Sequence, residues 1–164
     1  MIPIESFLDI SPLNWKALLT SLLCGTLLGA ERQFRGKPVG IRTASLITLG
    51  TSLVIILSKS VVAEATDPSR IIGQMITGIG FIGAGVMFSR DGLVQGVTSA
   101  ATIWILAAIG IAIGLGYYEA AVKVSLYALL ILTSVNVLER LFKSLNRGVH
   151  VKNAKAGNQS ISDQ

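Results

Sequence analysis

The sequence predicts an all-α integral membrane protein, folded as a compact bundle of about five transmembrane helices. Of the 164 residues, 51% are hydrophobic and only 14% are charged. Soluble domains carry roughly 25% charged residues, so this chain has too little polar surface to cover a fold in water. Its apolar residues also gather in runs close to the roughly 20 residues that a helix needs to cross a bilayer.

Five apolar runs define the expected helices, and the charges within them lie near their ends. Lys16, Lys59 and Lys123 occupy such end positions, where a long side chain reaches the polar interface. All four prolines lie outside the runs, which fits continuous helices. The runs are Leu13–Ala30, Thr43–Val62, Ile71–Phe88, Val97–Gly116 and Ala120–Phe142.

The charge of the connecting segments predicts the topology. The first loop and the tail after the fifth run carry an excess of Arg and Lys, whereas the N-terminal segment and the second and fourth loops are net negative. Because basic loops stay in the cytoplasm, we expect the N-terminus outside and the C-terminus in the cytoplasm. Residues 1–11 hold no Lys or Arg, so the first run is expected to be retained rather than cleaved as a signal peptide. We therefore expect a transmembrane domain over residues 1–142 and a short, basic, disordered cytoplasmic tail over 143–164.

The first loop, residues 31–43, is the most informative polar segment. Its four cations are suited to binding anionic headgroups or a phosphate. The alternative is that they only determine the topology. Glu31 is the one acid at this end of the first run, and an acid at membrane depth is costly unless it is paired. Arg32 or Arg42 is the expected partner, in a functional site or in a plain interfacial salt bridge.

Two other polar segments have ordinary structural interpretations. Asp67 followed by Pro68 is typical of a helix start, with Asp67 at the N-cap. Arg90, Asp91 and Gly92 resemble a tight turn, and the apolar residues 92–96 could re-enter the membrane.

Small residues recur at helical spacing inside the runs. Gly25 and Gly29 form one GxxxG pair, and Gly110 and Gly114 form another. Such spacing lets helix backbones approach closely in lipid, within one subunit or in a homo-oligomer. The third run adds Gly73, Gly80 and Gly83, and its GxGxxG segment, residues 78–83, lacks the strand and acidic residue of a dinucleotide site.

The chemistry-bearing residues argue against an enzyme. The one histidine, His150, lies in the tail, and the one cysteine, Cys24, lies inside an apolar run. No spacing resembles a metal site, a carboxylate pair or a nucleophile with its base, so we expect neither catalysis nor a metal or other cofactor. The basic residues flank apolar runs instead of following one helical face, which argues against nucleic-acid binding.

Three segments together resemble the MgtC/SapB family of membrane proteins. The resemblance implies a multi-pass protein of the bacterial inner membrane, linked to growth in low magnesium and to survival inside host cells. Many members carry a C-terminal domain of the ACT type, whereas this chain stops about twenty residues after its last run. The six polar positions that match the family's motifs are Glu31, Arg32, Arg42, Thr43, Asp67 and Arg70. The segments are 25–33 with 40–43, 67–70 with 78–85, and 92–93 with 98–104 and 107–110.

Two functions follow as hypotheses. The resemblance implies a regulatory protein, surrounded by membrane lipids, that binds other membrane proteins, with the ATP synthase as the suggested partner. The alternative is a transporter or channel for Mg2+ or a small solute, motivated by Glu31, Asp67 and Asp91 near the ends of the runs.

Overall fold

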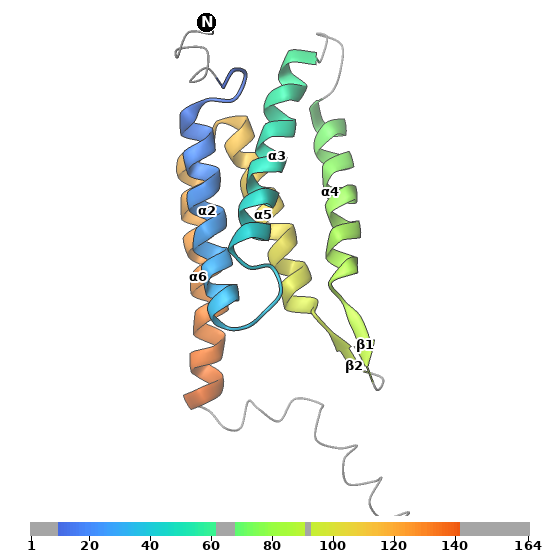
Figure 1. The fold of residues 1–164 in the computed structure, drawn as a ribbon, viewed down its shortest axis with the longest axis vertical. Helices are drawn as coiled ribbons and strands as arrows, with labels where there is room; N and C mark the ends of the chain where they lie inside the picture. The colour runs from blue at the N-terminus through green and yellow to red at the C-terminus, as the bar shows by residue number, and fades with distance from the viewer. Residues whose placement is uncertain (1–9, 62–67, 91–92, 142–164) are drawn as a thin grey trace, which may run out of the picture. The chain divides into compact units, whose positions relative to one another are not determined.

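The computed structural model describes residues 10–61, 68–90 and 93–141. Asp67, Asp91, Gly92 and the tail from residue 142, all singled out above, lie outside the described residues. The described part contains five long helices, as the apolar runs predict, and two short strands (Figure 1). The helices are α2 (Trp15–Phe34), α3 (Ile41–Val61), α4 (Pro68–Gly85), α5 (Val97–Leu115) and α6 (Tyr118–Leu141), and the strands are β1 (Phe88–Arg90) and β2 (Leu93–Gln95).

The chain divides into two compact units, residues 1–129 and residues 130–164. The first unit contains α2 to α5, both strands and the first half of α6. The described part of the second unit is the rest of α6, where Thr133 donates a hydrogen bond to the carbonyl of Leu130 in its own helix. All the contacts described below belong to the first unit.

The all-α prediction is wrong between α4 and α5, where the chain forms a β-hairpin. Strands β1 and β2 pair antiparallel, with Phe88 opposite Gln95 and Arg90 opposite Leu93. Strand β2 occupies most of the apolar segment 92–96, for which membrane re-entry was one option. The hairpin ends at Gly96, which has a φ of 88°, and a Cβ there would overlap the carbonyl of Val86. Glycine is therefore required where the hairpin joins α5.

Helix α2 is longer at its C-terminus than its apolar run. Asn14 caps its start by accepting a 2.7 Å hydrogen bond from the amide of Ala17. At its end, Gly36 is left-handed with a φ of 61°, and the amide of Lys37 bonds to the carbonyl of Arg32 at 2.9 Å. This is a Schellman motif, which places the helix end at the first glycine after the run. Glu31 and Arg32, expected in the loop, are therefore helical.

Helix α3 lies against both α2 and α5, and glycines make these approaches close. A Cβ at Gly25 would lie 2.5 Å from the Cα of Ser45, and one at Gly29 would lie 2.6 Å from the Cα of Ile41. On the α5 side, a Cβ at Gly114 would lie 2.7 Å from the carbonyl oxygen of Ser52, and Gly110 is equally crowded. No larger residue fits at these four positions without moving a backbone.

The other predicted packing glycines lie in α4 and behave differently. A Cβ at Gly73 or Gly80 would meet no atom of the described structure within 4 Å. Gly83 is buried and makes ordinary contact with Ala100 of α5. Helix α4 thus packs on α5 through one face and leaves its glycine-rich face open.

Hydroxyl side chains lie between the helices beside an apolar core that includes Leu28, Ile103, Leu106, Ile109 and Ile113, and many other large apolar side chains lie outside. Thr48 of α3 donates a 2.9 Å hydrogen bond to the carbonyl of Ser21 in α2, and the hydroxyls of Ser21 and Ser52 are 3.1 Å apart. The buried hydroxyl residues are Ser21, Thr48, Thr51, Ser52, Ser99, Thr102 and Ser125. The exposed apolar residues include Leu19, Leu23, Phe34, Leu46, Phe81 and Leu126.

Two of the described helices are both long and apolar enough to cross a membrane. They are Ile41–Lys59 within α3 and Val97–Leu115, which is all of α5. For α2, α4 and α6, a membrane-spanning role stays a prediction.

Candidate functional site

The structure separates the polar positions that the sequence analysis grouped together. Glu31 and Arg32 are buried in the last turns of α2. Arg42 and Thr43 are exposed in the first turn of α3. Arg70 is exposed in the first turn of α4. Because α4 begins where α3 ends, this turn lies a whole helix length away from Glu31 and Arg32 (Figure 1). The candidate site therefore contains two of the five predicted residues that the structure describes.

Glu31 forms its closest ion pair with Arg35, which the sequence analysis did not consider. One carboxylate oxygen lies 2.5 Å from Nε of Arg35, and the other lies 4.0 Å from Nη1 of Arg32. Among the described residues, the expected partner Arg42 forms no ion pair with Glu31, because Arg42 lies in the first turn of the next helix, whereas Arg35 is one turn along α2. The Glu31 side chain is only 6% exposed, and no described group donates a well-aligned hydrogen bond to either carboxylate oxygen.

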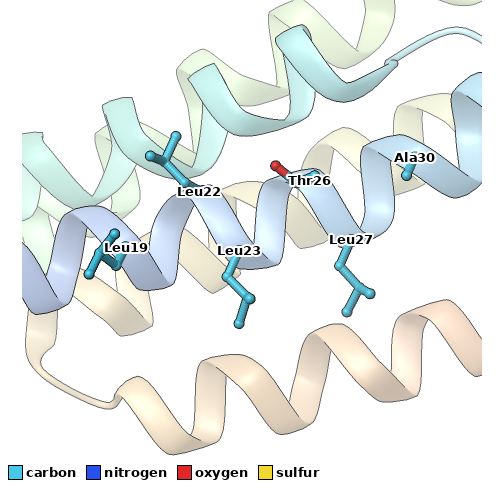
Figure 2. A pocket seen from close by; sticks show the side chains of 6 residues that line it. All are labelled: Leu19, Leu22, Leu23, Thr26, Leu27 and Ala30. Carbon is cyan, nitrogen blue, oxygen red and sulfur yellow. The ribbon is translucent and has the colours of Figure 1, made fainter.

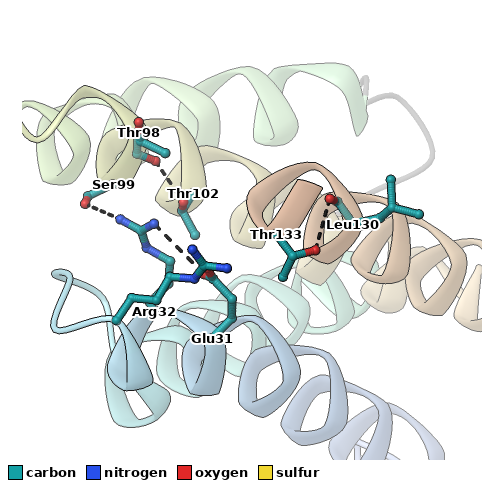
Figure 3. Close-up of polar contacts among 8 residues, drawn as sticks. Glu31, Arg32, Thr98, Ser99, Thr102, Leu130 and Thr133 are labelled. Atoms are coloured by element: carbon teal, nitrogen blue, oxygen red, sulfur yellow. Dashed lines mark hydrogen bonds and ion pairs between the residues drawn. The ribbon is translucent and has the colours of Figure 1, made fainter. Parts of the chain in front are cut away.

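Arg32 connects the end of α2 to the start of α5 (Figure 3). Its Nη2 donates a 2.9 Å hydrogen bond to Oγ of Ser99, and both side chains are buried. Within the described residues, its Nε has no hydrogen-bond partner. Burial lowers the pKa of this guanidinium, and the neighbouring Glu31 carboxylate acts in the opposite direction.

The cluster of Glu31, Arg32, Arg35 and Ser99 is positively charged overall. It joins two guanidinium groups and one carboxylate, while the positive dipole end of α5 at Ser99 and the negative dipole end of α2 offset each other. In the described part of the chain, no three His, Cys, Asp or Glu residues lie close enough to hold a metal ion. The arrangement therefore favours an anion over a divalent cation.

The sequence held signals for the two residues that were missed. Arg35 follows Glu31 at the i,i+4 spacing of a helical ion pair. That signal was hidden because Gly36, Pro38 and Gly40 made the whole segment look like a loop. Ser99 was noted only as part of a motif, since its contact with Arg32 spans 67 residues of sequence.

An apolar groove of about 530 Å³ runs along α2 and reaches the residue before Glu31 (Figure 2). Thr26 supplies its one hydroxyl. Its lining residues are Leu19, Leu22, Leu23, Thr26, Leu27 and Ala30.

Comparison with known proteins identifies the family. The model of the MgtC family matches residues 18–141, which cover most of the chain and all four residues of the cluster. The chain belongs to the MgtC family. No solved structure matches it significantly.

Curated members of the MgtC family align with most of this chain. The "Putative magnesium transporter YhiD" of Escherichia coli K12 is 39% identical over 154 residues, covering 90% of this chain and 70% of that protein. Protein MgtC of Salmonella typhimurium LT2 is 40% identical over 123 residues, and that of Brucella abortus is 35% identical over 145. These alignments cover 75% and 82% of this chain, but only 51% and 60% of the two MgtC proteins.

Proposed function

We propose that this MgtC-family protein is a multi-pass protein of the bacterial inner membrane. Its side-chain distribution supports this, because many leucine, isoleucine and phenylalanine side chains cover the outside in addition to the apolar side chains of the core. Soluble monomers rarely expose so much contiguous apolar surface, whereas lipid accepts it. The basic loop after α2 supports a cytoplasmic position for this loop and for the C-terminal end of α2. Reporter fusions after residues 37 and 117 test this topology, and equal periplasmic reporter activity at both would contradict it.

Within the membrane, the proposed role is regulatory and non-enzymatic, exerted by binding another membrane protein during adaptation to low magnesium. The observation that carries it is the open face of α4. The glycine pairs of α2 and α5 are covered by α3, but Gly73 and Gly80 of α4 face open space, and Phe81 beside them is 84% exposed. A groove of small residues beside a projecting aromatic ring suits a second transmembrane helix. The family resemblance makes the ATP synthase the first partner to test, and survival in host cells the first phenotype.

The test compares matched glycine substitutions in two helices. Gly80→Leu fills the open face of α4, and Gly50→Leu adds the same side chain to α3, where a Cβ at Gly50 also meets open space. We expect ATP hydrolysis and proton pumping in bacterial membranes to respond to the wild type and to Gly50→Leu, and not to Gly80→Leu. Equal activity in membranes with and without the protein, at comparable expression, would count against the ATP synthase as partner. Pull-down from native membranes in mild detergent then distinguishes another partner complex from a homo-oligomer.

The alternative function is transport of Mg2+ or a small solute, and the name of the E. coli relative YhiD favours Mg2+. Glu31 is the buried acid available to such a path in the described chain, and two guanidinium groups already neutralise it. Mg2+ flux into liposomes that contain the purified protein tests this alternative. Flux above that of empty liposomes, reduced in a Glu31→Asp variant that keeps the charge, would favour transport over regulation.

A further inference from the structure

We propose that Arg32, Ser99 and the N-terminal turn of α5 form a binding site for a phosphate group that also carries a hydroxyl, with Arg35 as its outer wall. Such a group occurs on protonated inorganic phosphate and on the headgroup of phosphatidylglycerol. The site is independent of the partner-binding face on α4.

Charge balance is the first argument. Two guanidinium groups face one carboxylate, while the positive end of the α5 dipole is offset by the negative end of the α2 dipole, where the three charged residues lie. Arg32 and Glu31 are each more than nine-tenths buried and cancel in charge, so the extra positive charge lies on Arg35, which is 30% exposed. An anion bound beside the two guanidinium groups would pair this extra charge.

The free donors are the second argument. Nε of Arg32 is buried and has no hydrogen-bond partner among the described residues, while Nη2 of the same group is directed at Ser99. The N-cap residue of α5 is Gly96, which has no side chain to accept from the first amides of the helix. A guanidinium fork next to uncapped helix amides is a common arrangement for binding phosphate oxygens.

A free acceptor makes the ligand more specific. Oε1 of Glu31 pairs with Nε of Arg35, whereas Oε2 is buried and no described group donates a hydrogen bond to it. A fully deprotonated anion would leave Oε2 unsatisfied, whereas a ligand hydroxyl can donate to it. The site therefore selects a phosphate with an O–H group over sulfate or chloride.

Access to the site passes Arg35. Its side chain is 30% exposed and pairs with the buried Glu31, so it lies between the cluster and solvent. Lys37, in the loop after α2, and Arg42, in the first turn of α3, are exposed and attract anions toward the site.

The experiment uses the full chain in nanodiscs and has two arms. In the first, inorganic phosphate is added to phosphatidylcholine nanodiscs, with potassium chloride at matched ionic strength as reference. In the second, phosphatidylglycerol replaces part of the phosphatidylcholine. The thermal unfolding midpoint is measured in both, and binding raises it. A rise with inorganic phosphate identifies a free phosphate, and a rise with phosphatidylglycerol alone identifies a lipid headgroup.

Matched variants show whether the cluster is responsible. Arg32→Gln should weaken binding by about tenfold or more, whereas Lys123→Gln makes the same charge change at an exposed position outside the cluster and should leave it unchanged. If Arg32→Gln does not fold, Ser99→Ala replaces it and should weaken binding several-fold. No midpoint shift in either arm, or an equal shift in the cluster variants and Lys123→Gln, would overturn the proposal.

Discussion

The guanidinium of Arg32 donates a 2.9 Å hydrogen bond to the hydroxyl of Ser99, across 67 residues of sequence. Arg32 lies in the last turn of α2, and Ser99 lies in the first turn of α5. Helices α2 and α5 also both pack on α3 through paired glycines. The bond therefore holds the C-terminal end of α2 against the N-terminal end of α5, where the charged cluster lies.

Removing the Ser99 hydroxyl should destabilise this junction. Ser99→Ala leaves Nη2 of the buried Arg32 without its acceptor, and we expect the free energy of unfolding to fall by about 1–3 kcal/mol. Chemical unfolding in detergent micelles, followed by circular dichroism, measures it. Thr77→Ala is the control, because Thr77 is exposed and bonds only within its own helix; its effect should stay within about 0.5 kcal/mol. Equal losses in the two variants would mean that the Arg32–Ser99 bond has no special weight.

The close approach of α2 and α3 predicts opposite results for two glycine substitutions. In Gly25→Ala, the new methyl group would lie 2.5 Å from the Cα of Ser45 and 2.7 Å from Oγ1 of Thr48. Separating the helices to admit it should cost about 1–3 kcal/mol. Gly73→Ala meets no atom within 4 Å, and it should be neutral or stabilise α4 by up to about 1 kcal/mol, because alanine favours the helix. Thermal unfolding of both variants in one detergent gives the comparison, and a destabilised Gly73→Ala would show that the face of α4 is already covered.

Much of this fold could be predicted from the sequence because hydropathy and helix spacing are local signals. The apolar runs locate all five helices, and Gly25, Gly29, Gly110 and Gly114, singled out by their spacing, lie at the close approaches to α3. The same spacing could not show that Gly73 and Gly80 lie on an open face, because a periodic pattern does not identify which neighbour covers a helix.

The hairpin and the site were harder to predict. Strands of three residues are too short for a period-two pattern to stand out beside the apolar helices. The end of α2 was misplaced because the apolar run stops before Glu31, Arg32 and Arg35, whereas the helix continues until Gly36 ends it. The contact of Arg32 with Ser99 depends on how three helices pack, and no local pattern encodes it.

Gly96 should be among the least tolerant positions of the chain. Its φ of 88° is costly for any residue with a Cβ, by about 1–2 kcal/mol, and a Cβ would also overlap the carbonyl of Val86. Gly116 is the matched control, because it has a similar φ of 98° but open space around it. We expect Gly96→Ala to lower the unfolding midpoint clearly more than Gly116→Ala does. Equal shifts would mean that the hairpin moves away at no cost, so that only the cost of the positive φ destabilises both variants.

Glu31 and Arg35 should differ in importance although they form one ion pair. Glu31→Gln leaves two guanidinium groups facing each other, one of them buried, and we expect a loss of up to about 3 kcal/mol in the free energy of unfolding. Arg35→Gln leaves Glu31 beside Arg32, and Arg35 is partly solvated, so its loss should stay near about 1 kcal/mol. Urea unfolding at matched detergent concentration measures the difference. If Arg35→Gln proves the more damaging change, the Glu31 carboxylate depends on Arg35 alone, and Arg32 serves only Ser99. The same asymmetry means that a loss of activity in Glu31→Gln is informative only after its folding is verified, which is why Glu31→Asp is the better probe of transport.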